Sequence, residues 1–151
     1  MKKRHLCIPL LTIILAGCTS APEQPGADAV LPPCGMLPNC VNSASGTGGS
    51  AIAPLQATVE QWQALKRWLA QQDDWTITVE TADFLQAVVK TPLMQFRDDV
   101  QLVFNRQAGE VQVRSSSRLG ISDMGANRRR VESLRTQLAN EIWRNSRKID
   151  K

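Results

Sequence analysis

The sequence contains no tyrosine, and its only histidine is His5. Because His5 lies in an N-terminal segment that we expect to be removed, the remaining chain has no imidazole. Its absence excludes a Ser-His-Asp triad, a Cys-His pair and a histidine-ligated metal site. Carboxylates or lysine remain available for acid–base chemistry. We therefore expect no bound metal and no cofactor.

A strong excess of charge is also missing. The formal net charge is +4, and three of the positive charges are Lys2, Lys3 and Arg4. Without that basic segment the balance is 4 − 3 = +1, which gives no reason to expect a nucleic-acid partner. Positive charge is concentrated in residues 114–151, where ten Lys or Arg residues stand against four acidic residues.

The N-terminus has the three parts of a secretory signal: basic residues 2–4, an apolar run over residues 6–15, and small residues before Cys18. The apolar run is too short to cross a bilayer core about 30 Å thick as a helix. The segment Leu15-Ala16-Gly17-Cys18 resembles the lipobox of bacterial lipoproteins. The resemblance implies a signal peptide at 1–17 and a lipidated, palmitate-bearing Cys18. An ordinary cleaved signal with a chance cysteine is the alternative.

Lipid attachment would place the protein in the bacterial cell envelope, with the membrane as its first partner. Thr19, and not aspartate, follows Cys18. In Gram-negative bacteria lipoproteins of that kind generally reach the outer membrane, so we expect its periplasmic face.

Two cysteines remain once Cys7 has left with the signal and Cys18 carries lipid. Cys34 and Cys40 are then an even pair in an oxidising compartment, which favours a disulfide. Two free thiols at a redox or metal site are the rival interpretation.

Composition divides the rest of the chain into a tether and one domain. Residues 18–33 are rich in Pro, Ala and Gly and read as a flexible tether after the lipid. Residues 34–151 are expected to form a single α+β domain, packed from about Pro54 onward. Residues 43–50 (SASGTGGS) read as a mobile surface loop.

Hydrophobic periodicity predicts two helices around a sheet. A capping box at Thr58 and Gln61 starts a helix over 59–72, and Asp123 is expected to cap a second helix over 125–147, with an apolar stripe ending at Ile142. Between them, alternation predicts strands over 75–80, 84–90, 99–104 and 111–113. Short connections imply a four-stranded antiparallel meander with both helices on one face.

Three segments resemble a known family: Pro38–Ser43 (PNCVNS), Phe96–Val100 (FRDDV) and Arg114–Glu132 (RSSSRLGISDMGANRRRVE). They are similar to the bacterial and plastid family called domain of unknown function 1499, over roughly residues 34–141. Asn42 stands where serine is common in that family. The resemblance implies an often exported or membrane-attached protein and supplies no catalytic residue.

These segments place acidic and basic side chains at one end of the expected sheet, where a simple register sets Asp99 opposite Ser115. One interpretation is an ion-pair network that pins the loop before the last helix. The other is a site for a phosphate, a carboxylate or an acidic lipid headgroup at the helix N-terminus, although Asp123 already supplies negative charge there. The candidate residues are Asp98, Asp99, Arg114, Arg118, Ser122, Asp123, Asn127 and Arg128.

Two functions from different classes follow. The first is a non-enzymatic accessory domain that binds an anionic envelope component or a protein partner. The second is a hydrolase-like enzyme in which Asp98, Asp99 or Asp123 acts as acid or base while arginines hold an acidic or phosphorylated substrate. A purely structural module for a protein partner is a third possibility.

Overall fold

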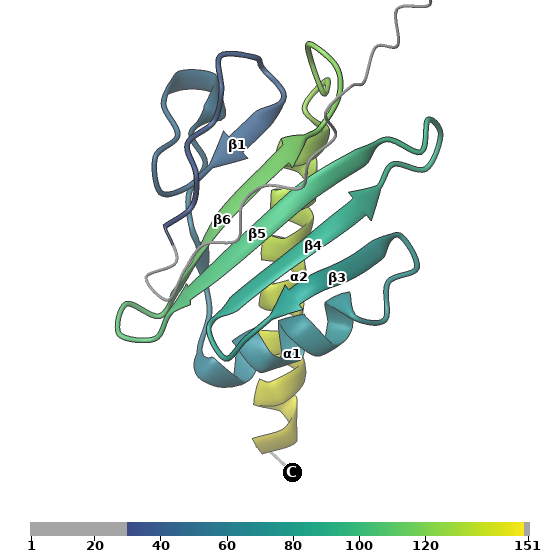
Figure 1. The fold of residues 1–151 in the computed structure, drawn as a ribbon. Helices are drawn as coiled ribbons and strands as arrows, with labels where there is room; N and C mark the ends of the chain where they lie inside the picture. The colour runs from purple at the N-terminus through teal and green to yellow at the C-terminus, as the bar shows by residue number, and fades with distance from the viewer. Residues whose placement is uncertain (1–29, 150–151) are drawn as a thin grey trace, which may run out of the picture.

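A computed structural model describes residues 30–149, with side chains through residue 140. Cys18, the signal segment and Ile142 therefore lie outside the described residues and side chains. One antiparallel sheet of six strands is combined with two α-helices (Figure 1), which confirms the α+β class. The elements are β1 (Cys40–Asn42), the 3-10 helix η1 (Gly48–Ser50), β2 (Leu55–Gln56), α1 (Val59–Leu69), β3 (Trp75–Glu80), β4 (Phe84–Lys90), β5 (Arg97–Asn105), β6 (Glu110–Ser117) and α2 (Ala126–Ile149).

The sheet is larger than the expected four strands. Its order is β1-β6-β5-β4-β3, and β2 also pairs with β6. The meander from β3 to β6 forms as expected, but β1 and β2 were not expected. Each has only two or three residues, too few for alternation to show in the sequence.

The packed region also begins before Pro54. Leu31, Val41 and Ile52 are all buried. The side-chain amide of Asn42 donates to the carbonyl of Pro32 (2.8 Å), which fixes the incoming chain beside β1. The expected start of packing at Pro54 is therefore wrong, because β1 and its flanking residues complete the sheet edge at β6.

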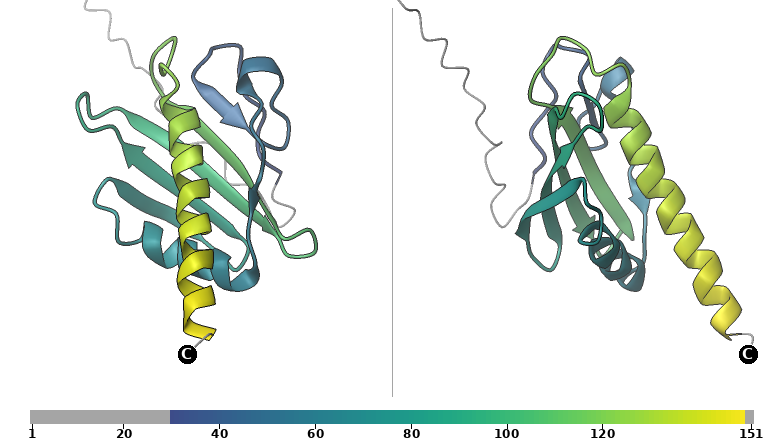
Figure 2. Two further views of the ribbon diagram at one scale, coloured as in Figure 1. Left: turned by 180° about the vertical axis from the view of Figure 1, so that it is seen from behind. Right: turned by 90° about the vertical axis from the view of Figure 1, so that its right-hand side faces the viewer.

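The core lies between the sheet and the two helices, which both pack on the same sheet face (Figure 2). The expected capping box is present: Gln61 N donates to Thr58 Oγ1 (3.3 Å) and Thr58 N to Gln61 Oε1 (2.7 Å). Burial of apolar side chains holds this layer together. The helices contribute Trp62, Leu65 and Leu69 from α1 and Val131, Leu134 and Leu138 from α2.

The other face of the sheet carries no helix of the described chain, and we call it the helix-free face (Figure 2). Alternation along β5 sends Val100 and Leu102 into the core, and Asp99 and Gln101 to the helix-free face. No helix among residues 30–149 has the length and apolarity needed to cross a membrane.

Candidate functional site: two ion pairs and a basic sheet face

The register between β5 and β6 differs by one residue from the expected one. Asp99 pairs with Ser116, and Asp98 pairs with Ser117. The acidic and basic candidates do meet at one end of the sheet. Because successive side chains point to opposite faces, Asp98 lies on the helix side and Asp99 on the helix-free face. The two carboxylates therefore belong to two separate groups of residues.

On the helix side a buried polar network joins α2 to the sheet. Arg130 Nη2 donates to Asp98 Oδ2 (2.6 Å), and Arg130 Nη1 donates to Asn127 Oδ1 (2.6 Å). Asn127 is 0% exposed; it donates to the carbonyl of Asn39 (2.9 Å) and accepts from Ser115 Oγ (2.6 Å). These bonds tie the start of α2 to β6 and to the segment before β1. Asn127 is thus fully engaged within the protein.

Arg130 was not among the expected site residues, although it makes the ion pair with the buried carboxylate of Asp98. Asp98 is 1% exposed. The sequence does contain a usable signal, because Asn127 and Arg130 are three residues apart and share one face of a helix. Arg128 points elsewhere: its Nη2 donates to the carbonyls of Gly49 (2.9 Å) and Ala51 (2.7 Å).

On the helix-free face, Asp99 is held by a bidentate ion pair. Arg118 donates from Nε to Oδ2 (2.8 Å) and from Nη2 to Oδ1 (2.7 Å). Hydrogen bonding to Asp99 raises the pKa of Arg118 above its usual value. Planar fork geometry of this kind both strengthens and orients the contact. The pair fixes the beginning of the loop between β6 and α2.

Asp123 caps α2, as expected. Its Oδ1 accepts from Gly125 N (2.9 Å) and its Oδ2 from Asn127 N (2.9 Å). Burial acts to raise the pKa of Asp123, but these hydrogen bonds outweigh it and hold the pKa below its usual value. Ser122 Oγ accepts from Met124 N (3.2 Å). Amides that an external anion would need at this helix end are therefore already bonded to the protein.

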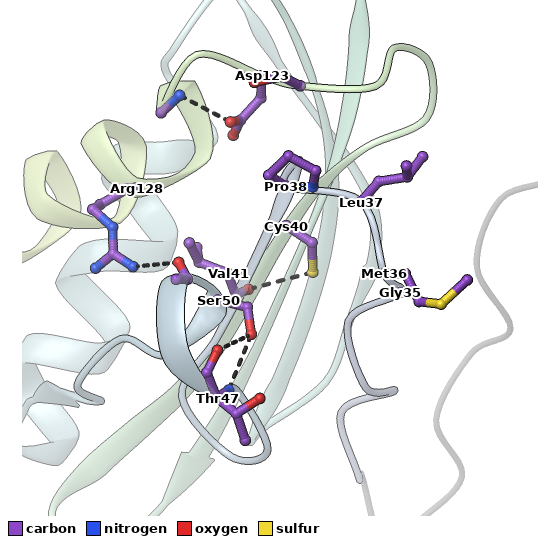
Figure 3. A pocket seen from close by; sticks show the side chains of 13 residues that line it. Gly35, Met36, Leu37, Pro38, Cys40, Val41, Thr47, Ser50, Asp123 and Arg128 are labelled. Carbon is purple, nitrogen blue, oxygen red and sulfur yellow. Dashed lines mark hydrogen bonds between the residues drawn. The ribbon is translucent and has the colours of Figure 1, made fainter.

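A pocket of about 560 Å³, lined by both polar and apolar residues, lies between the segment before β1, η1 and the start of α2 (Figure 3). Cys34 and Cys40 form a disulfide beside it, as the cysteine count predicted. Asp123 and Arg128 contribute to its wall, and Met36 and Leu37 point away from it (Figure 3). Both wall residues are occupied by the bonds described above.

Arg114 differs from Arg118 and Arg130 because it bonds no carboxylate. Its Nη1 donates to Ser116 Oγ (2.8 Å), and its Nε is buried without a hydrogen-bond partner. Burial lowers the pKa of the Arg114 guanidinium, and the charge of Asp99 offsets only part of that effect. Arg114 is therefore a partly buried cation whose charge no direct carboxylate contact balances.

A row of polar side chains crosses the strands beside Arg114. The register aligns Gln86, Gln101, Arg114 and Asn42 across β4, β5, β6 and β1. Gln101 Nε2 donates to Gln86 Oε1 (3.1 Å), while Gln101 Oε1 is buried and unpaired. An unpaired acceptor thus lies next in register to the unpaired donor of Arg114.

Two more cations lie on the helix-free face, at the end of the sheet where β4 ends and β5 begins. Lys90 and Arg97 are exposed and directly opposite each other on β4 and β5. The described residues show no ion pair for either of them, and Arg118 N donates to the Arg97 carbonyl (3.2 Å) beside them. We call Lys90, Arg97, Arg114 and Arg118 the basic face. These four cations stand against Asp99, which is bonded to Arg118, and against Asp74, whose carbonyl accepts from Lys90 N (2.9 Å), so positive charge is in excess here.

Residues 30–140 contain no cluster of three or more His, Cys, Asp or Glu side chains that could hold a metal ion. A search of curated proteins found no match, and neither did a search of solved structures. A family model described as "Protein of unknown function (DUF1499)" matches residues 30–138, which is more than half of the chain. The chain therefore belongs to the DUF1499 family.

Proposed function

We propose that the protein is a lipid-anchored, non-enzymatic domain of the bacterial envelope that binds an anionic envelope component through its basic face. The signal segment and the lipobox-like Leu15–Cys18 support the anchor, and Thr19 supports the periplasmic face of the outer membrane. The excess positive charge of the basic face supports the choice of an anionic ligand.

The single observation on which the binding role rests is the unbalanced charge of Arg114. Arg118 and Arg130 each bond a carboxylate, so they fasten the fold. A desolvated arginine without such a partner is unfavourable, and like charges directly opposite in a sheet, as at Lys90 and Arg97, repel. An anion bound at Arg114 would relieve the first of these effects.

The carboxylates argue against the hydrolase alternative. Both oxygens of Asp99 are bonded to Arg118, and both oxygens of Asp123 are bonded to backbone amides. Asp98 is buried beneath α2. A general acid or base must reach the proton that it transfers, and these three side chains are held away from a substrate.

Anion binding is tested by thermal unfolding of the mature protein in detergent, with inorganic phosphate, citrate and soluble peptidoglycan fragments as probes. An anion at 100 times its Kd should stabilise the fold by about 2.7 kcal/mol. Arg114→Gln should abolish that gain. Arg106→Gln is the matched control, because exposed Arg106 pairs with Asp83 at the opposite end of the sheet. Equal stabilisation of both variants would reject the basic face as the site.

The anchor has its own test. Metabolic labelling with a palmitate analogue should label the wild-type protein and leave Cys18→Ser unlabelled, with the variant lost from the membrane fraction. Labelling that persists in Cys18→Ser would contradict lipid attachment at this residue.

A further inference from the structure

Exposed apolar side chains gather at one end of the molecule. Among the described side chains ten large apolar residues are exposed, and eight of these lie in three loops: residues 34–39, residues 91–96 and residues 118–125. All three loops lie at the end of the sheet toward which β4 and β6 run (Figures 1 and 2). The eight are Met36, Leu37, Leu93, Met94, Phe96, Leu119, Ile121 and Met124, and we call this surface the loop end.

Hydrogen bonds hold the three loops together as one surface. Asn39 Nδ2 donates to the Gly120 carbonyl (2.8 Å), which joins the first loop to the third. Arg118 N donates to the Arg97 carbonyl (3.2 Å), which joins the third loop to the base of the second. Met36, Leu93 and Met124 are 103%, 91% and 88% exposed. Single exposed apolar residues are ordinary, but a cluster of this size indicates an interaction surface.

The loop end also has a basic border and an apolar hollow. Lys90 and Arg97, the exposed cations of the basic face, flank the 91–96 loop. A groove of about 840 Å³ opens between this loop and the start of α2, and Trp68 and Trp75 line it. Apolar side chains with neighbouring cations and tryptophans suit a lipid–water interface with anionic headgroups.

The turns at the opposite end of the sheet are polar. They carry the exposed ion pair between Arg106 and Asp83 (2.7 Å), and none of the ten exposed large apolar residues lies in them. An apolar end and a polar end give the domain a direction relative to a membrane.

The chain before the described residues is long enough to permit this orientation. Eleven residues lie between Cys18 and Val30, and this segment can span at most about 40 Å when fully extended. The nine-residue strand β5 is about 30 Å long. A domain anchored at Cys18 can therefore turn either end of its sheet toward the bilayer.

We propose that the loop end inserts its apolar side chains into the surface of an anionic lipid bilayer, with Lys90 and Arg97 among the headgroups. The occupant is the bilayer that carries the Cys18 lipid, so this inference rests on the proposed anchor. Insertion gives the domain a second membrane attachment beside its lipid and fixes which end faces the membrane.

The test uses the mature lipidated protein reconstituted into vesicles. An environment-sensitive fluorophore is attached in Ile121→Cys at the loop end, or in Gln107→Cys at the opposite end as the control. On vesicles containing phosphatidylglycerol, the label at position 121 should shift its emission to shorter wavelength and be quenched by nitroxide-bearing lipids. The label at position 107 should stay unchanged. Lys90→Gln with Arg97→Gln should reduce the shift at position 121.

Each other outcome is informative. Protein that floats with vesicles but shows the same solvent-exposed signal at positions 121 and 107 would overturn the insertion and leave the anchor intact. Protein that fails to float even with neutral vesicles would reject the anchor itself. A shift at position 121 that already occurs in the protein without its lipid, in the absence of vesicles and detergent, and that grows with protein concentration would assign the loop end to protein contacts and overturn the bilayer proposal.

Discussion

Asp98 and Asp99 are neighbours in the chain, yet their carboxylates lie on opposite faces of the sheet and bond different arginines. Asp98 meets Arg130 of α2, and Asp99 meets Arg118 of the loop that precedes α2. The alternation of a β-strand makes this separation unavoidable. One acidic dipeptide thus fastens a helix to one face of the sheet and a loop to the other.

Asp99→Asn should destabilise the domain by about 3 kcal/mol, because it leaves the half-buried guanidinium of Arg118 without its carboxylate. Urea unfolding of Asp99→Asn, Arg118→Gln and the double variant gives a double-mutant cycle. The double variant should lose less stability than the sum of the single variants, with a coupling of about 1–3 kcal/mol. Strictly additive losses would mean that the ion pair contributes nothing to the fold.

Asn127→Ala should cost about 2–4 kcal/mol. The substitution removes the hydrogen bonds to Arg130, Ser115 and Asn39 and leaves buried partners unsatisfied. Asn140→Ala is the matched control, since Asn140 is exposed on the same helix and its change should stay within about 0.5 kcal/mol. Similar unfolding midpoints for the two variants would contradict a structural role for Asn127.

Arg114→Met should leave the free energy of unfolding unchanged or increase it, because replacing a desolvated and poorly paired charge by an apolar side chain is often neutral or favourable. Arg118→Met, with the same chemical change, should destabilise the domain because it leaves the carboxylate of Asp99 without its ion-pair partner. Chemical denaturation measures the free energy of unfolding of each variant and so tests this difference. A large loss of stability in Arg114→Met would show that Arg114 is scaffolding and would weaken its assignment to ligand binding.

Asp123 should make the domain sensitive to acid. Because hydrogen bonding holds its pKa below the unfolded value of about 3.9, it stabilises the fold above that pH. The stabilisation is lost as the pH falls through the lower, folded pKa. Melting temperatures from pH 6 to pH 2.5 should therefore fall more for the wild type than for Asp123→Asn, which cannot titrate. Parallel curves would contradict this contribution.

Removing the disulfide should cost about 2 kcal/mol in the chain-entropy picture, because Cys34 and Cys40 close a short loop with a sequence separation of six. The variant with both cysteines changed to serine should melt at the same temperature as the wild type treated with reductant. A wild-type melting temperature that reductant does not change would show that the bond contributes nothing measurable.

Patterns among residues close in sequence were sufficient to predict several of the helices and strands. The capping pair Thr58 and Gln61 located α1, and alternation located the strands from β3 to β6. Asp123 marked the start of α2 because its side chain bonds amides only a few residues ahead. In each case, residues close in sequence determine the structure.

Elements that depend on distant partners were missed. β1 exists because Cys40–Asn42 pairs with Arg114–Ser116. A strand of three residues is too short for its alternation to be recognised in the sequence. The β5–β6 register was wrong by one residue, because Asn105 Oδ1 and the positive φ of Gly109 shape a turn whose length the sequence does not specify. The choice of Arg130 over Arg128 likewise depends on how α2 is rotated against the sheet, which only packing determines.

The pairing of β6 with β5 on one side and with β1 and β2 on the other sets the order in which the sheet can assemble. β6 is the last strand of the described residues. The backbone of Val41 in β1 has no strand partner until Ser115 of β6 has been synthesised. During synthesis the N-terminal strands therefore stay unpaired until nearly the whole domain has been made, because contacts of such long sequence separation form late.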